Sequence, residues 1–403
     1  MAEKKKLRIL AVPANTGGCA YYRIIMPMEK LQEHYPDEVE VRFEENPLGI
    51  DKEKGGQVPD WDFADMKWAD IVFTQNISNY GGPYTIEVLR KAWELGKFTH
   101  FDTDDLLTDL YEGHRLYDTY KEHKLDDITK AIYANSDLVT VTQRKFAERV
   151  APYVRRALVV IKNQIDYNLP CWNLPKRPSF RKKSCRIGWV GGIHHEEDVR
   201  EISNYLMGVN SKVGLENVRW DFYGRPPQDP ENPKDWQQDV WDQYEKILSV
   251  GLNRTRRNWQ VLGALPCHGY GAFYTDMDVS IAPLQYNEFN DSKSEIKVME
   301  CGRYGIPLVC SDVGCYSETI VNGETGYIIP RDNPRNEWVR ILAKVSKDKK
   351  HREEMGRNLK QITDERFDIN KTVGQRLDLY RQLMNLKETA KAAKENEQKE
   401  NQT

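Results

Sequence analysis

The sequence predicts an α/β protein with two domains, each built around a parallel sheet. The chain has 403 residues, which is enough for two separate cores. Short apolar runs alternate with helical segments, an order typical of doubly wound sheets, which bind ligands at the carboxyl ends of their strands. Glycine pairs at positions 17–18 and 191–192 each follow such a run. Glycines at such a turn let backbone N–H groups approach a ligand closely.

The first domain is predicted to begin with a strand at residues 7–13. The turn at residues 15–23, which contains Gly17, Gly18 and Arg23, opens a helix that runs to residue 31. The turn is not GxGxxG, so a dinucleotide fingerprint is not indicated, and a tight turn without a ligand stays an alternative. The other predicted elements are strands at residues 68–75, 97–102, 134–142 and 157–161, and a helix at residues 84–95.

Three aspartates, Asp102, Asp104 and Asp105, follow the strand at residues 97–102. A helix N-cap would account for one of them but not for three. Metal binding and acid/base chemistry are the other interpretations, and both suit carboxylates at the carboxyl end of a strand. In an enzyme, Asp104 or Asp105 would orient an acceptor hydroxyl or take its proton.

Composition excludes several classes of protein. The chain is 39% apolar and 30% charged with a net charge of −3, so its charge gives no support to a protein that coats nucleic acid. No apolar run approaches the ~20 residues that span a bilayer, and the N-terminus lacks the features of a signal peptide. The seven cysteines are scattered without a CxxC pair, which predicts a reducing cytoplasm.

Two basic stretches have open interpretations. Residues 170–184 combine prolines with lysines and arginines, which predicts an exposed linker; a polyanion contact and a solvated hinge are both open. Residues 226–258 read as a polar insertion that ends in Arg254, Arg256 and Arg257. Nucleic-acid contact and a small helical flap are both open there.

The second domain is predicted to open with a strand at residues 185–192, followed by His194 and His195. Adjacent histidines do not readily bind one metal and no third ligand lies nearby, so a metal site is rejected. Further elements are strands at residues 218–224, 259–263, 278–283 and 306–311, a hairpin at 323–330, and helices at 337–347, 351–367 and 373–386. Residues 387–403 are polar and free of aromatics, which predicts disorder.

Residues 290–307 carry the strongest functional pattern. Ser294 is a good helix N-cap, and a glycine and a proline at positions 305 and 307 end the helix. Lys293, Lys297 and Glu300 fall on one stripe of that helix. Free N–H groups, the helix dipole and two lysines favour a diphosphate, and the carboxylate beyond them suits a sugar diol. The alternative is a solvated charge pattern on an exposed helix face.

This stretch resembles the nucleotide-sugar site of GT-B glycosyltransferases of the family 4-like branch. Asn290, Lys293, Ser294, Lys297 and Glu300 match its N-x-x-K-S-x-x-K-x-x-E pattern, and residues 300–309 match its E-x-G-x-x-G-x-P-x-V continuation. The branch often has a pair of acids eight positions apart. Ser292 stands where the first acid would be.

The resemblance implies two facing Rossmann-like domains with a nucleotide sugar in the cleft. The expected boundaries are an acceptor domain at 1–169, a basic linker at 170–184, a donor domain at 185–345, helices that cross back at 346–386, and a tail at 387–403. The expected co-substrate is a UDP-sugar, transferred with retention and without a metal or another cofactor. Asp104, Asp105 and Lys297 would be catalytic, and the implied donor-binding residues are Gly17, Gly18, Arg23, Gly192, His195, Lys293, Ser294, Lys297 and Glu300.

The acceptor is inferred from a narrower resemblance. The turn at residues 17–23 and the block at residues 101–105 look most like glycosyltransferases of large bacteriophages, some of which modify hydroxymethylated bases in DNA. A hydroxymethylpyrimidine in double-stranded DNA is therefore the leading acceptor, bound through Asp102, Arg254, Arg256 and Arg257 in the cytoplasm of an infected cell. The alternatives are a glycan, lipid or protein hydroxyl, or an inert module that only binds a nucleotide sugar.

Overall fold

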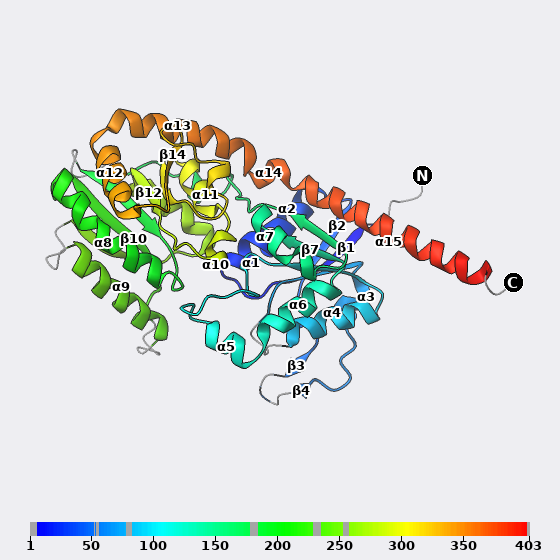
Figure 1. The fold of residues 1–403 in the computed structure, drawn as a ribbon. Helices are drawn as coiled ribbons and strands as arrows, with labels where there is room; N and C mark the ends of the chain where they lie inside the picture. The colour runs from blue at the N-terminus through cyan, green and yellow to red at the C-terminus, as the bar shows by residue number, and fades with distance from the viewer. Residues whose placement is uncertain are drawn as a thin grey trace.

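The chain folds into two α/β domains joined by helices at one side (Figure 1). The computed structural model describes residues 6–51, 53, 56–77, 83–177, 184–228, 235–252 and 258–400. Each domain contains a six-stranded sheet, and every strand pair in these two sheets is parallel. The predicted class, an α/β protein with two Rossmann-like domains, is confirmed.

The sheet of the first domain has the strand order β2-β1-β5-β6-β7-β8. Alternate residues of β1 (Leu7–Val12) are buried on opposite faces: Ile9 packs in a core with α2 (Met26–His34), and Leu10 packs in a core with α4 (Tyr84–Glu94). Burial on both faces explains the continuous apolar runs. The other strands of this sheet are β2 (Val39–Phe43), β5 (Ile71–Thr74), β6 (Phe98–Asp102), β7 (Leu138–Val141) and β8 (Ala157–Val160).

The sheet of the second domain has the order β11-β10-β9-β12-β13-β14. Successive strands are added on one side up to β11 and on the other side from β12 on, so the order reverses between β9 (Cys185–Val190) and β12 (Val279–Ala282). Ligands of open α/β sheets bind at this reversal, outside the carboxyl ends of the strands. The remaining strands are β10 (Val218–Arg225), β11 (Trp259–Gly263), β13 (Leu308–Ser311) and β14 (Gly326–Ile329). The long helices are α8 (Glu196–Val213), α9 (Trp236–Leu252), α11 (Ile296–Arg303), α12 (Pro334–Lys347) and α13 (Lys349–Arg366).

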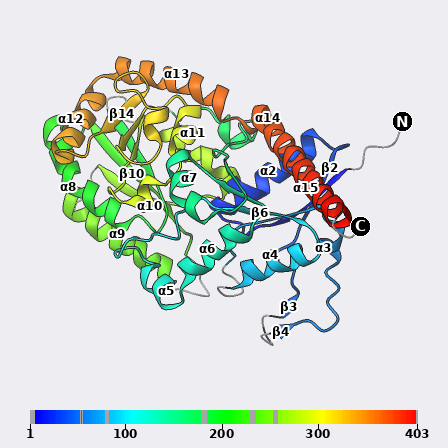
Figure 2. The same ribbon diagram turned by 45° about the vertical axis from the view of Figure 1, so that its right-hand side comes forward.

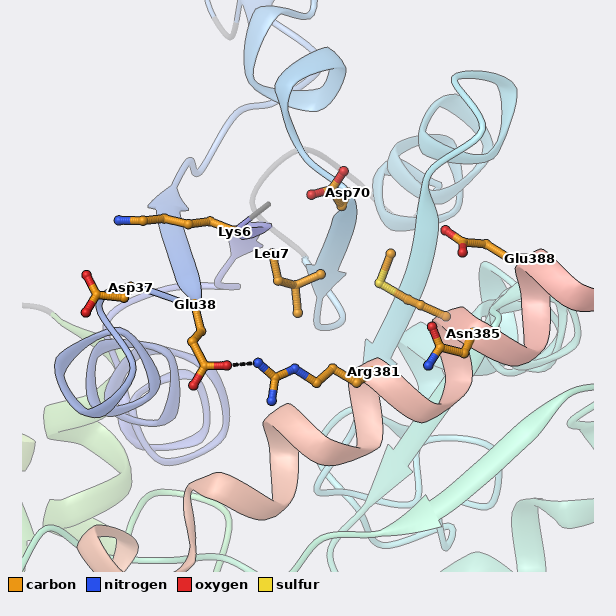
Figure 3. Close-up of a pocket in the computed structure, with 9 residues that line it drawn as sticks. Lys6, Leu7, Asp37, Glu38, Asp70, Arg381, Asn385 and Glu388 are labelled. Atoms are coloured by element: carbon orange, nitrogen blue, oxygen red, sulfur yellow. Dashed lines mark hydrogen bonds and ion pairs between the residues drawn. The ribbon is translucent and has the colours of Figure 1, made fainter. Parts of the chain in front are cut away.

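The C-terminal helices return to the first domain, along the top of Figure 1 and, turned, in Figure 2. After α14 (Ile369–Thr372), α15 (Gly374–Glu400) packs on the first sheet, where the buried Tyr380 hydroxyl lies 2.9 Å from Nδ1 of His100. Figure 3 shows Arg381 of α15 directed toward Glu38, to which it donates a hydrogen bond. These contacts hold α15 against the first domain.

Three segments differ from their sequence-based predictions. β14 pairs in parallel with β13, so residues 323–330 are not a hairpin. Residues 236–252 form α9, whose Trp241 is fully buried in the domain core, so that part of residues 226–258 is integral to the domain. The helix α15 continues to Glu400 through a segment for which disorder is predicted, because its alanines, lysines and glutamates have high helix propensity.

Candidate functional site

A cavity of about 780 Å³ lies between the two domains, within the size range of ligand sites. The turn after β1 contributes Gly17 and Gly18 from the first domain, and the turn after β9 contributes Gly192 from the second. The loop at residues 265–268 and the start of α11 complete the wall. The cavity therefore opens at the sheet reversal of the second domain, where a nucleotide is expected in this fold.

Gly18 and Gly192 face open space. A Cβ atom added to either residue would have no atom within 4 Å, and both residues are exposed in the cavity wall. Neither position has the left-handed backbone that favours glycine. At both positions the missing side chain leaves space beside the backbone that a ligand phosphate could occupy.

Glu300 is the most deeply buried acid of the cavity, with 1% of its side chain exposed. Its Oε2 atom accepts hydrogen bonds from the Tyr274 hydroxyl at 2.6 Å and from Lys297 Nζ at 2.8 Å. Among the described residues both contacts are made by Oε2, which leaves Oε1 for a ligand diol. Nζ of Lys297 also lies 5.8 Å from the centre of the Tyr270 ring, so this cation is held inside the cavity wall.

Lys293 lies in the loop before α11 and reaches across the cleft. Its Nζ is 3.1 Å from Oδ1 of Asp105 in the first domain and 4.5 Å from the centre of the Phe289 ring. Burial acts to lower the pKa of Lys293, but the charge and hydrogen bond of Asp105 outweigh it and raise the pKa above its ordinary value. Lys293 is therefore protonated and positively charged at the junction of the domains.

The helix start differs by one residue from the prediction. α11 begins at Ile296 with Glu295 as its N-cap residue, whereas Ser294 Oγ lies in the cavity wall and accepts a hydrogen bond from Asn163 Nδ2 at 2.8 Å. This bond crosses between the domains and occupies the hydroxyl that was expected to cap the helix. Glu295 is itself buried and pairs with Lys162 at 2.9 Å.

Asp104 and Asp105 occupy the first-domain side of the cavity, next to Cys19. Burial first, and then the neighbouring charge of Asp105, raise the pKa of Asp104 to about 6. Burial also acts on Asp105, but Lys293 lowers the pKa of that carboxyl below its usual range. One carboxylate is thus poised to exchange a proton near neutral pH, while its neighbour stays ionised.

Asp102 and Arg23 do not take part in the cavity between the domains. Both side chains are 0% exposed and pair at 2.7 Å. The Arg23 guanidinium also donates to the Ile161 carbonyl and to Asn163, and Thr140 donates to Asp102. Because the polar atoms of Arg23 are occupied inside the first domain, we leave Arg23 out of the donor site. Asp102 lines a second cavity, which lies within the first domain, instead of the cavity between the domains.

His195 lies in the cavity wall, and its Nδ1 is 2.8 Å from Oδ2 of Asp198, which fixes the ring. His194 instead stacks on His114 of the first domain, with ring centres 5.9 Å apart. Burial, followed by the proximity of His194, lowers the pKa of His114 to about 4. His194 and His114 are thus a neutral contact between the domains.

Other predicted residues lie elsewhere. Ser292 is 0% exposed and donates to the Glu288 carbonyl at 3.0 Å, so it has a structural contact in place of the missing acid. Arg254, Arg256 and Arg257 lie outside the described residues, as do residues 178–183 of the predicted linker. Within the described residues, no group of three or more acids, histidines or cysteines could hold a metal, and no helix is long and apolar enough to cross a membrane.

Several residues of the cavity were not predicted from the sequence. Tyr270 lines the cavity and comes from the segment Cys267–Asp276, as does Tyr274, which contacts Glu300 but is not part of the wall. Tyr22 is buried in the wall, and its hydroxyl has no hydrogen-bond partner among the described residues. The density of aromatic residues in this segment was the available signal. Tyr274 could not be linked to Glu300 from the sequence, because 26 positions separate them.

Comparison with known proteins agrees with this geometry. Residues 245–362 match the family model described as "Glycosyl transferases group 1", and this range includes Lys293, Lys297 and Glu300. No sequence among the curated proteins matches the chain significantly.

Solved structures share the fold. Sucrose-phosphate synthase from Thermosynechococcus elongatus superposes with a TM-score of 0.67 at 14% identity, over 95% of this chain and 100% of that one. HepE of Anabaena, solved with UDP and glucose, has a TM-score of 0.61 at 12% identity, over 93% and 99%. TarM of S. aureus, solved with UDP among its ligands, has a TM-score of 0.57 at 15% identity, over 79% and 56%.

Proposed function

We propose that this chain is a glycosyltransferase that moves a sugar from a nucleotide sugar, UDP-sugar being the favoured donor, to a hydroxyl acceptor. The observation that carries the proposal is the convergence of Lys293, Lys297 and Glu300 on one cavity between the domains. Two cations and two open glycine turns suit a diphosphate, and the free oxygen of a buried carboxylate suits a ribose diol. UDP in the HepE and TarM structures, together with the match to the group 1 glycosyl transferases, favours the same donor.

The proposed chemistry follows from the charges. The acceptor oxygen forms a bond to the anomeric carbon while the bond from that carbon to the diphosphate oxygen breaks, and its electron pair leaves with the diphosphate. Lys297 and Lys293 stabilise the negative charge that develops there. We assign proton uptake from the acceptor to Asp104, because Lys293 lowers the pKa of Asp105 and so makes Asp105 the weaker base. Retention at the anomeric carbon and independence from a metal belong to the same proposal.

For the acceptor we propose a hydroxymethylpyrimidine base in DNA, as in the bacteriophage enzymes that the first-domain motifs resemble. A cytoplasmic location suits all seven cysteines, which are free thiols. A glycan, lipid or protein hydroxyl is the alternative acceptor. An inert module that only binds a nucleotide sugar is the alternative from another class. It is suggested by Ser292, which stands where the family's first acid would be.

Thermal unfolding with UDP tests the donor. UDP should raise the Tm of the wild-type protein. When a UDP-sugar is supplied instead, the protein should also hydrolyse it slowly and release free sugar. UDP binding with neither sugar release nor transfer would favour the inert module. Nucleoside mass spectrometry after incubation with donor and either hydroxymethylated or plain duplex tests the acceptor, and an unchanged mass across several donors would contradict it.

A further inference from the structure

A chain of hydrogen bonds runs from the interior of the first domain to the cavity between the domains. Arg23, which does not line that cavity, donates through Nη1 to Oδ1 of Asn163 at 3.1 Å. Asn163 Nδ2 in turn donates to Ser294 Oγ at 2.8 Å. Asn163 is 4% exposed, and both Asn163 and Ser294 line the cavity. The chain therefore links a cation enclosed in one domain to a hydroxyl in the cavity wall of the other.

The chemistry of arginine fixes the direction of these bonds. A guanidinium carries N–H donors and no acceptor, so the atom of Asn163 that faces Arg23 must be the carbonyl oxygen Oδ1. The amide nitrogen then faces Ser294, and because this nitrogen only donates, the Ser294 oxygen must accept. The opposite orientation of the amide would place two donors against each other. Ser294 thus keeps its own hydroxyl proton, which has no acceptor among the described residues.

Arg23 is held from its other side, so it cannot turn away from Asn163. Its Nε and Nη2 atoms donate to the two carboxylate oxygens of Asp102 at 2.9 and 2.7 Å, and Nη1 also donates to the Ile161 carbonyl at 2.6 Å. Burial acts to raise the pKa of Asp102, but the charge and hydrogen bonds of Arg23 outweigh it and lower that pKa. Asp102 is therefore ionised, and its oxygens only accept hydrogen bonds.

The same reasoning continues to the C-terminal helix α15. The Thr140 hydroxyl donates to Asp102 at 2.5 Å, so Thr140 Oγ1 must accept from Nε2–H of His100 at 2.7 Å. Burial lowers the pKa of His100 to about 3, so the ring is neutral and its Nδ1 atom carries a lone pair. Nδ1 accepts from the Tyr380 hydroxyl of α15 at 2.9 Å. Donors thus reach Asp102 from both sides, and each bond between Tyr380 and Ser294 has a defined donor.

We propose that Asn163 is a positioning residue of the donor site, which makes Ser294 a hydrogen-bond donor to the diphosphate of the nucleotide sugar. Ionised phosphate oxygens only accept, and a hydroxyl that already accepts from Asn163 has its proton available for them. Arg23 and Asp102 act through Asn163 and do not touch the ligand. This inference rests on the proposed function and gives the buried ion pair of the first domain an indirect part in donor binding.

Asn163→Asp tests the inference by reversing one bond. A carboxylate at position 163 accepts from Arg23 as the amide oxygen does, but it has no N–H, so the Ser294 proton turns toward it and away from the ligand. The Arg23 guanidinium beside it offsets the cost of burying the new charge. UDP binding, measured by isothermal titration calorimetry, should weaken by about tenfold in Asn163→Asp and in Ser294→Ala, the effect of one hydrogen bond to a charged group.

Three comparisons separate positioning from the added charge and from damage to the fold. Asn163→Asp should lose much less UDP affinity in the Ser294→Ala background, because no hydroxyl is left to turn. Uridine, which lacks the diphosphate, should bind every variant as it binds the wild type. Asn210→Asp is the matched control: Asn210 is also a buried asparagine, and its Oδ1 accepts from Trp220 Nε1 at 3.0 Å, but it does not line the cavity. Its UDP affinity should not change, and thermal unfolding without ligand shows that each variant folds.

A loss of UDP affinity in Asn163→Asp that largely disappears in the Ser294→Ala background, with uridine binding unchanged, supports the inference. Equal losses in both backgrounds would assign the effect to the added charge and overturn it. An unchanged UDP affinity in either single variant would also overturn it, while the glycosyltransferase proposal stands because the wild type still binds UDP. A wild-type protein that does not bind UDP would contradict the proposed function itself and, with it, this inference.

Discussion

Asp102 and Asp105 come from the same four-residue run of the first domain, but the ion pairs that they form differ in their surroundings. Asp102 pairs with Arg23 where both side chains are 0% exposed, whereas Asp105 pairs with Lys293 across the cleft, with 35% and 21% exposed. The donors of Arg23 are occupied by Asp102, Ile161 and Asn163. Lys293 faces the cavity and can exchange Asp105 for a ligand. Location, and not residue type, separates the pair enclosed in the first domain from the pair that faces the cavity.

Breaking the buried pair of Asp102 and Arg23 should have the largest effect, a loss of stability. Asp102→Ala leaves the Arg23 guanidinium buried without its counter-charge and should cost about 3–5 kcal/mol of unfolding free energy. Urea unfolding followed by intrinsic fluorescence measures it. Asp105→Asn, the matched change at the cleft, should cost less than about 1 kcal/mol because that pair is partly exposed. Equal losses in the two variants would show that the two pairs do not differ as described.

Glu300→Ala should have the next largest effect, on ligand binding. Loss of one or two hydrogen bonds to a carboxylate, about 1.5–3 kcal/mol, should weaken UDP binding by about 10- to 100-fold and remove the Tm rise. Isothermal titration calorimetry measures the change. Glu318→Ala is the control, because Glu318 is an exposed carboxylate outside the cavity wall. An undiminished UDP affinity in Glu300→Ala would contradict the proposed ribose contact.

From the ion pair between Lys293 and Asp105 we expect two opposite changes in UDP affinity. Lys293→Met should weaken UDP binding because a cation at the diphosphate is lost. Asp105→Asn should strengthen UDP binding by up to about fivefold. In this variant Lys293 does not have to give up its ion pair with residue 105, of about 1 kcal/mol or less, before it contacts the diphosphate. Titrations at low and high salt check both changes, since added salt screens these charges. Weaker binding in Asp105→Asn would show that this carboxylate assists the donor instead of competing with it.

The effect of Asp104→Asn on stability should depend on pH. The pKa of Asp104 is raised to about 6 in the folded protein, so the folded state binds this proton more tightly than the unfolded state. Ionised Asp104 therefore lowers stability above pH 6, and Asp104→Asn should raise the Tm at pH 7. The gain should shrink as pH falls and be absent below about pH 4, where Asp104 is protonated in both states.

The pH dependence of the transfer rate tests the role of Asp104 independently of stability. As a proton acceptor Asp104 must be ionised, so the wild-type rate should rise as pH increases through about 6. Asp104→Asn should lack that rise and retain the UDP-dependent increase in Tm. A rise with the same midpoint in Asp104→Asn would assign the proton to another group.

Much of the fold and part of the site could be predicted because they depend on local pattern. Apolar runs such as that of β1, buried on both faces, predict parallel strands, and the spacing of Lys297 and Glu300 places them on one face of α11. Arg23 was assigned to the ligand because a sequence does not reveal which cations are already paired inside a core. The second cavity was missed because its walls come from three strand ends and two helices.

The sequence by itself determined two parallel-sheet domains and the helix that carries Lys297 and Glu300, since these follow from periodicity and from residue spacings of a few positions. Only the tertiary structure decided which of three neighbouring aspartates turns inward to Arg23 and which meets Lys293 across the cleft. It also decided that Gln75 Oε1 is buried without a hydrogen-bond partner among the described residues. The physical reason is that pairing and burial depend on atoms from distant segments, whose approach is set by the packing of whole sheets and helices.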